Sequence, residues 1–194
     1  MEVHLASLPE RYAMVVSPAQ VRAHIAMAAR LRGRSVVVEI RRLPHSIELT
    51  ACTRDRPFRL SQLCGVLTIN DLNILGALAF TRTDGVVIDL FHCVGVDGRL
   101  ALSREAAQKL ERDFNAILGG QVDLEKAYAA HAEKWKWRAA KGVPVSTVVE
   151  FENELSHEST IVDLTARDKP GLLYRVTRIF SEEGLDIQSA QIST

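Results

Sequence analysis

The sequence predicts an α+β fold in which one supersecondary unit is built twice. The evidence is a gapless repeat between residues 54–81 and 167–194, with a period-2 strand pattern before each copy and a helical stripe inside it. The recurring positions are Arg54, Asp55, Pro57, Leu60, Leu72, Ile74, Ala77 and Thr81, matched by Arg167, Asp168, Pro170, Leu173, Leu185, Ile187, Ala190 and Thr194. We expect the second unit to be truncated.

A helix and a strand are predicted before the first copy. Residues 17–20, Ser-Pro-Ala-Gln, combine an N-cap serine, a first-turn proline and a glutamine suited to a capping box. The helix should run to about Leu31 and stop at Gly33. The alternating Val36, Val38 and Ile40 then form a strand.

Each copy is predicted to run strand, helix, strand. The opening strands alternate at Ile47, Leu49 and Ala51, and at Val162, Leu164 and Ala166. Asp55 and Asp168 each lie two residues before a proline suited to a first helical turn, so each aspartate should accept from free helix N–H groups. The helical stripes are Leu60, Leu63, Val66 and Leu67, and Leu172, Leu173, Val176, Ile179 and Phe180. Gly184 should stop the second helix, and further strands should cover residues 73–81 and 186–194.

The first copy continues with a hairpin and a second helix. Thr83-Asp84-Gly85 has turn chemistry, and residues 86–94 are rich in β-branched and aromatic side chains. Ser103 should cap a helix that Gly119-Gly120 ends. This order is that of a split βαβ unit of ferredoxin-like type, which requires a closing strand. Residues 145–151 are the candidate, but they could equally open the second unit.

A helical insert is predicted over residues 122–141, with Leu124, Ala127, Tyr128, His131 and Trp135 on one face and Lys134, Lys136, Arg138 and Lys141 near its end. One interpretation takes Trp135-Lys136-Trp137 as a platform for a nucleotide. The other packs Trp135 on the sheet, with the late cations opposing the helix dipole. The even charge balance of the chain favours the second interpretation.

These motifs resemble the ACT regulatory domain. The resemblance rests on the Asp-x-Pro-Gly-Leu-Leu turn at 168–173, the Gly-Leu-Asp-Ile-Gln-Ser-Ala entry at 184–190, and the Thr-Arg-Thr-Asp-Gly hairpin with Asp89-Leu90-Phe91 after it. The spacing of the copies, the run Phe-Glu-Asn-Glu-Leu-Ser at 151–156, and the linker-like residues 8–12 and 23–24 are similar to the C-terminal region of the bacterial PII uridylyltransferase/uridylyl-removing family. The resemblance implies a helical linker over 1–34, a first ACT domain over 35–154 with an insert over 121–141, and half of a second over 155–194.

The resemblance also implies a function. Glutamine would bind the chain and switch a catalytic domain between adding UMP to the PII signal protein and removing it, and ACT units would associate with one another. The effector-binding residues carried over are Asp168, Gly171, Leu172, Asp186, Gln188, Ser189 and, in the first copy, Asn73. Three of them have structural alternatives: Asp168 could be only a helix cap, Gly171 could be only a packing glycine, and Asn73 could simply shape a turn. Phe58-Arg59 replaces the expected Gly-Leu, which should keep a ligand from the first loop.

No catalytic motif is recognisable in the sequence. The nucleotidyl-transfer and paired His-Asp patterns of the uridylyltransferase family do not occur, and the six histidines have no metal-site spacing. We therefore expect no catalytic residues, no metal site and no cofactor in this chain, with Mg²⁺ belonging to the family's catalytic domains. Whether the chain is a fragment of such an enzyme stays open.

Composition indicates a globular chain. Of 194 residues, 47% are hydrophobic and 25% are charged, and the net charge of zero favours neither nucleic acid nor an anionic membrane. Cys52, Cys64 and Cys93 are expected to be reduced core thiols. With no apolar run of membrane-spanning length and no signal segment, we expect a cytoplasmic location.

Three hypotheses for the function remain open. The first is the effector-sensing region of a PII uridylyltransferase. The second is a stand-alone tandem ACT protein that binds a ligand or dimerises, and the third is the regulatory tail of another amino-acid metabolic enzyme.

Overall fold

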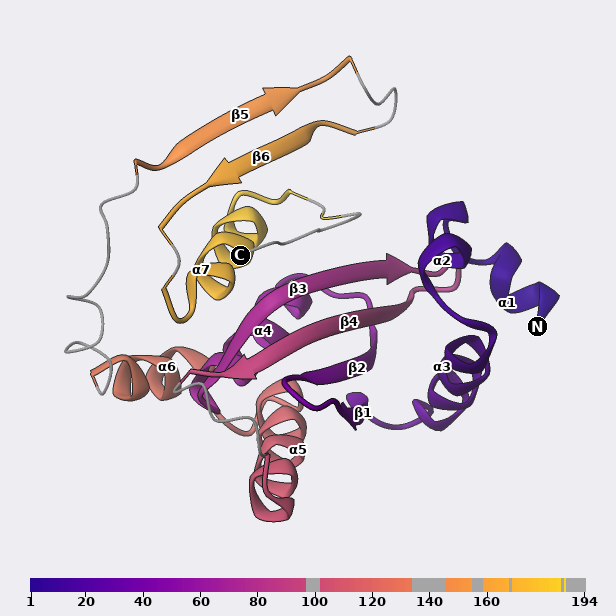
Figure 1. Cartoon of the computed structure of the whole chain (residues 1–194), viewed down its shortest axis with the longest axis horizontal. Coiled ribbons are helices and arrows are strands. Elements are labelled where there is room, and N and C mark those ends of the chain that lie inside the picture. Colours follow the sequence, from indigo (N-terminus) through magenta and orange to yellow (C-terminus); the bar gives the residue numbers. More distant parts are fainter. Residues whose placement is uncertain (97–101, 134–145, 155–158, 168, 186, 188–194) are drawn as a thin grey trace.

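The computed structural model describes residues 1–96, 102–133, 146–154, 159–167, 169–185 and 187. The first copy forms a four-stranded antiparallel sheet with strand order β1-β2-β4-β3 (Figure 1). Its strands are β1 (Val36–Arg42), β2 (Ile47–Arg54), β3 (Leu72–Thr81) and β4 (Val86–Gly95). The sheet confirms the predicted α+β class and its ferredoxin-like character.

Two helices cover one face of this sheet. They are α4 (Arg59–Ile69) and α5 (Arg104–Leu118), and they enclose the main core with the inward residues of β2, β3 and β4. As predicted, Ser103 caps α5 by accepting from the N–H of Ala106 at 3.1 Å. The Asp84-Gly85 hairpin also forms, with Gly85 at φ 74°.

The N-terminal segment covers the opposite face. Its helices are α1 (Glu2–Ala6), α2 (Glu10–Val15) and α3 (Pro18–Arg30), and α3 begins with the predicted Ser17 and Gln20 capping box. Tyr12 packs against Phe80 and Ile88 of the sheet, while Met27 and Leu31 pack near Val37, Cys52 and Val86. All three cysteines are free and buried, as expected.

The strand that the sequence left open belongs to the second sheet. β5 (Val148–Glu152) pairs antiparallel with β6 (Ile161–Thr165), with Val149 opposite Leu164. In the first copy, β1 pairs antiparallel with β2 in the same way and occupies the sheet position in which a closing strand would lie. The repeat therefore extends one strand upstream in both copies.

Two predictions about helix starts are wrong. Helices α4 and α7 (Leu172–Glu182) begin two residues after Pro57 and Pro170, so these prolines lie in the preceding turns rather than in the first helical turn. The N-cap of α4 is Phe58, without a side-chain hydrogen bond, so Asp55 is not the cap. The reason is that a left-handed N-cap residue, Phe58 or Gly171, redirects the chain into each helix. Asp168 lies outside the described residues.

Helix α7 packs on the first copy. Its buried residues are Tyr174 and Thr177, and it lies against α4. Leu172, Leu173, Val176 and Phe180 of the predicted stripe are only half-buried, and Ile179 is 51% exposed. Figure 1 shows α7 between the β5 and β6 hairpin and the four-stranded sheet. The residues of α7 that are buried, Tyr174 and Thr177, are not those of the predicted stripe. Gly184, at φ 70°, follows its end as predicted.

The insert contributes α6 (Leu124–Ala132), which packs against α4. The side chain of Asp123 caps it, accepting from the N–H groups of Glu125 and Lys126 at 2.9 and 3.2 Å. The Trp135-Lys136-Trp137 run and its basic neighbours, and the predicted strand over 186–194 apart from Ile187, lie outside the described residues. None of the helices in the described part of the chain has the length and apolar character needed to cross a membrane.

Candidate effector-binding site

The turn before α7 brings backbone groups to a helix N-terminus. Gly171 is the N-cap at φ 79° and ψ 9°, a left-handed conformation that glycine adopts without the steric cost of a side chain. The N–H of Leu172 donates to the carbonyl of Lys169 at 3.0 Å, and the N–H of Arg175 donates to the carbonyl of Gly171 at 3.1 Å. The first N–H groups of a helix and its dipole favour a negatively charged group, so this turn suits a carboxylate.

Tyr128 of α6 lies directly over this turn. A Cβ placed on Gly171 would meet the Tyr128 hydroxyl, with the ring atoms Cε2 and Cζ only 2.8 and 3.0 Å away. The Tyr128 ring also packs against Tyr174, with the ring centroids 4.6 Å apart. Burial raises the pKa of Tyr128, so its hydroxyl stays protonated at neutral pH. Glycine at position 171 therefore adopts the left-handed conformation without strain and leaves room for the approach of Tyr128.

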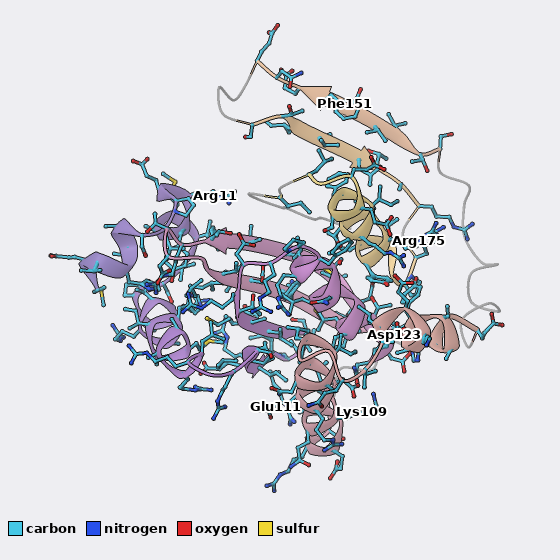
Figure 2. All side chains as sticks on the ribbon, turned by 180° about the vertical axis from the view of Figure 1, so that it is seen from behind. Arg11, Lys109, Glu111, Asp123, Phe151 and Arg175 are labelled. Atoms are coloured by element: carbon cyan, nitrogen blue, oxygen red, sulfur yellow. The ribbon has the colours of Figure 1, made fainter. Side chains whose placement is uncertain are left out.

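Helix α6 also contacts α4 and α7 at other points. Arg178 of α7 forms an ion pair with Glu125 at 2.8 Å. His131 Nε2 lies 3.0 Å from the Asp71 carboxylate at the end of α4. At the first turn of α6, Leu124 packs on α4 at Gly65, where an added Cβ would be 2.6 Å from Leu124 Cδ2. Figure 2 shows Asp123 of α6 and Arg175 of α7 on the same side of the molecule.

The first copy has the same turn with a different residue. Phe58 is the N-cap of α4 at φ 64° and ψ 3°, close to the angles of Gly171. A bulky residue in this region costs about 1–2 kcal/mol, because its Cβ crowds the following carbonyl. The backbone geometry of the turn is thus kept in both copies, but in the first a phenylalanine side chain, 38% exposed, stands at it.

Comparison with known proteins matches the second copy to a known domain family. The ACT domain family model matches residues 160–194. The chain is 29% identical over 175 residues to the bifunctional uridylyltransferase/uridylyl-removing enzyme of Rhodospirillum rubrum, covering 88% of this chain and 19% of that enzyme. The enzymes of the same name from Gluconobacter oxydans and Rhodopseudomonas palustris are each 29% identical, over 76% of this chain and 16% of theirs. The chain fits the C-terminal ACT region of this family. It spans less than a fifth of the length of these relatives.

The ACT resemblance carried over seven candidate effector-binding residues, and the structure describes three of them. Gly171 and Leu172 are adjacent at the α7 N-terminus. Asn73 lies on β3 of the first ACT unit, opposite Val94, and is half-buried. Asp168, Asp186, Gln188 and Ser189 lie outside the described residues. The structure thus places the described candidates on two different ACT units, and their role as ligands stays a prediction.

The sequence analysis missed a buried polar cluster in the first ACT unit. Thr53 lies near the end of β2, Arg59 begins α4, and Asp89 lies within β4. Among the described residues, Thr53 Oγ1, Arg59 Nε and both carboxylate oxygens of Asp89 are buried without a hydrogen-bond partner. The pKa of Asp89 is raised to about 8, mainly by burial and also by the nearby Asp55, while Arg59 opposes the shift. Asp89 is therefore mostly protonated at neutral pH.

A sequence signal for this cluster did exist. Val87, Asp89, Phe91 and Cys93 alternate on the helix-covered face of β4, so a carboxyl group stands in an otherwise apolar row. Asp89 belongs to the ACT hairpin motif, and a motif match alone does not reveal that its side chain is buried. Within the part of the chain that the structure describes, no cluster of three or more His, Cys, Asp or Glu side chains could hold a metal ion.

Proposed function

We propose that this chain is the effector-sensing region of a bifunctional uridylyltransferase/uridylyl-removing enzyme and that its effector is glutamine. The observation that carries the proposal is the left-handed glycine turn at the N-terminus of α7, in a unit that matches the ACT family. Similarity to enzymes of that name over most of the chain supports the choice of enzyme. In the whole protein, the chain would act on catalytic domains that modify the PII signal protein with UMP, using Mg²⁺, in the cytoplasm.

The chemistry of the turn fits an amino acid. The α-carboxylate would accept from backbone N–H groups at the start of α7, where the helix dipole favours negative charge. Because Gly171 has no side chain, the ligand could approach the backbone closely. The candidates Asp168, Asp186, Gln188 and Ser189 would then contact the ammonium and amide groups.

Regulation needs only a modest difference in affinity. If glutamine binds one arrangement of the two ACT units better than the other by about 1–3 kcal/mol, it shifts their equilibrium by the corresponding factor. The ACT units would transmit this shift by associating with each other or with a second copy. No nucleic acid or membrane partner is required.

Calorimetric titration of the full chain with glutamine tests this proposal. We expect saturable heat with glutamine and much less with glutamate or valine, because only glutamine offers both the carboxylate and the neutral amide. Gly171→Ala should weaken binding at least tenfold, since its methyl group would cover the backbone at the turn. Gly184→Ala is the matched control: Gly184 also has a positive φ beside α7, but open space surrounds it.

Two results would contradict the proposal. One is the absence of heat with glutamine together with clear heat from a branched or aromatic amino acid, which would favour the regulatory tail of another metabolic enzyme. The other is equal loss of glutamine binding in both glycine variants, which would trace the effect to the stability of α7 rather than to the turn.

A further inference from the structure

Helix α6 joins three parts of the molecule at the Gly171 turn. Tyr128 covers the turn itself, Glu125 pairs with Arg178 of α7, and His131 pairs with Asp71 after α4. The α6 residues that make these contacts lie within a helix of nine residues. One short element thus connects the first ACT unit to the candidate effector site of the second.

We propose that α6 is an autoinhibitory latch, in which Tyr128 competes with the amino-acid effector for the turn at Gly171. This inference rests on the proposed function, because it assumes that the effector binds at that turn. In the docked state α6 covers the turn; in the released state the backbone of Gly171 and Leu172 is open. The effector binds the released state only.

The geometry of Tyr128 excludes an effector from its side of the turn. Even one added carbon on Gly171 would be 2.8 Å from Tyr128 Cε2, closer than carbon atoms pack in proteins. An effector atom that contacts the Gly171 backbone from this side would need at least the space of that added carbon. Tyr128 must therefore move before a ligand can reach the turn from the face that α6 covers.

The contacts of α6 are weak enough to release. None of its residues is fully buried; Leu124, Ala127, Tyr128 and His131 are only half-buried. The side chains of Arg178 and Glu125 are 35% and 64% exposed, and an exposed ion pair stabilises a fold only weakly. Elements with few buried contacts open at low free-energy cost, so α6 can detach while the sheet of the first unit stays intact.

A latch of this kind has two linked consequences. The apparent affinity for the effector equals the affinity of the released state multiplied by the fraction of molecules in which α6 is released. By reciprocity, the bound effector shifts the equilibrium of α6 toward the released state. Both tryptophans of the chain, Trp135 and Trp137, follow α6 closely in the sequence, so their fluorescence reports its release.

The test compares glutamine binding by the wild-type chain and the variant Tyr128→Ala. If α6 is a latch, removing the ring should tighten glutamine binding by about 5-fold or more, the lower end of typical coupling. Glu125→Ala, which breaks only the ion pair with Arg178, should tighten it in the same direction but less. Lys126→Ala is the control on the same helix: its side chain is 87% exposed, so affinity should not change.

Tryptophan fluorescence separates the latch from other effects. In the wild-type chain, glutamine should change the emission, and Tyr128→Ala without glutamine should already show the changed emission. If Tyr128→Ala binds glutamine equally or more weakly than the wild type, Tyr128 is not a competitor and the latch is overturned while the proposed function stands. If neither protein binds glutamine, the proposed function fails, and the latch fails with it.

Discussion

At the scale of single residues, Asp89 is a carboxyl group in the apolar interior of the first ACT unit. It is 2% exposed, and its two oxygens have no hydrogen-bond partner among the described residues. A buried carboxylate without partners is costly, so the group keeps its proton to a higher pH. Arg59 lies near enough to oppose this shift but does not reverse it.

This burial predicts how stability depends on pH. The pKa of Asp89 is about 8 in the folded chain and about 4 in the unfolded chain, so the folded state binds more protons between these values. The stabilisation from the proton is complete below pH 4 and is lost as pH rises through 8. Asp89→Asn keeps the shape without the charge, so at pH 8.5 it should be more stable than the wild type by a few kcal/mol, on the order set by the shift.

Urea denaturation of both proteins at pH 5 and pH 8.5 measures this difference. At pH 5 the difference should be much smaller than at pH 8.5, because most of the pH range between the unfolded and folded pKa values of Asp89 lies above pH 5. Glu48→Gln is a control on the neighbouring strand β2, since Glu48 is only partly buried and pairs with Arg41. A stability difference between Asp89→Asn and the wild type that is the same at both pH values would show that Asp89 does not titrate on unfolding.

At the scale of elements, a chain of buried hydrogen bonds attaches helices α1 to α3 to the sheet. Arg82 can only donate, so His4 Nδ1 accepts its hydrogen bond at 3.1 Å and His4 carries its proton on Nε2. His4 Nε2 then donates to the Tyr12 hydroxyl at 3.2 Å, which donates to His24 Nδ1 at 2.7 Å. Both histidines must be neutral for this direction to hold. Burial lowers both pKa values, that of His24 to about 4.

Removing the central hydroxyl should loosen these helices. Tyr12→Phe keeps the ring that packs on Phe80 but leaves His24 Nδ1 and His4 Nε2 unpaired, which costs about 1–3 kcal/mol. The folded pKa of His24 is below its unfolded value of 6.5, so its contribution is present above pH 6.5 and is lost as pH falls toward 4. The difference between Tyr12→Phe and the wild type in urea denaturation should therefore shrink from pH 7 to pH 4. A difference that grows on acidification would contradict the direction of this hydrogen-bond chain.

Local signals made several elements predictable from sequence. Ser17 with Gln20, Ser103, and the Asp84-Gly85 turn each act within a few residues, and the structure contains all three features. The starts of α4 and α7 were misplaced because the left-handed N-cap of each helix was not recognised. The place of β5 could not be predicted because strand pairing depends on distant segments, and the same strand pattern suits either sheet.

The candidate site was predictable only in part for a similar reason. Gly171 is visible in the sequence because glycine adopts a left-handed turn without steric cost. Tyr128 comes from a segment more than forty residues earlier, and only the packing of α6 brings its ring to the turn. Asp89 lies in a strand whose pattern gives its face, but not the lack of partners for its carboxyl group there.

At the scale of the whole molecule, the two ACT units meet through α4 in the part of the chain that the structure describes. β1 and β2 precede α4 as β5 and β6 precede α7, and the described strands form two separate sheets. The exposed apolar residues of the β5 and β6 hairpin include Phe151, which is 68% exposed (Figure 2). The second unit is thus held to the first mainly by the contact of α7 and α6 with α4.

Gly65 is the point of closest approach in this contact. It lies in the buried middle of α4, and an added Cβ would be 2.6 Å from Leu124 Cδ2 and 3.0 Å from Tyr174 Cδ2. Gly65→Val places two further carbons there, so α6 and α7 should be pushed away from α4. Hydrogen exchange should then become at least tenfold faster in α6 and α7. β2 and β4 should keep their protection, because the hydrogen bonds and core of these strands lie on the far side of α4 from this contact.

Gly33→Ala is the control: an added Cβ at Gly33 would meet no heavy atom within 4 Å, so this variant should not speed exchange in α6 or α7. Equal loss of protection in β2, β4, α6 and α7 of Gly65→Val would mean that the two units unfold as one, and the description of a second unit held by a separable contact would be wrong.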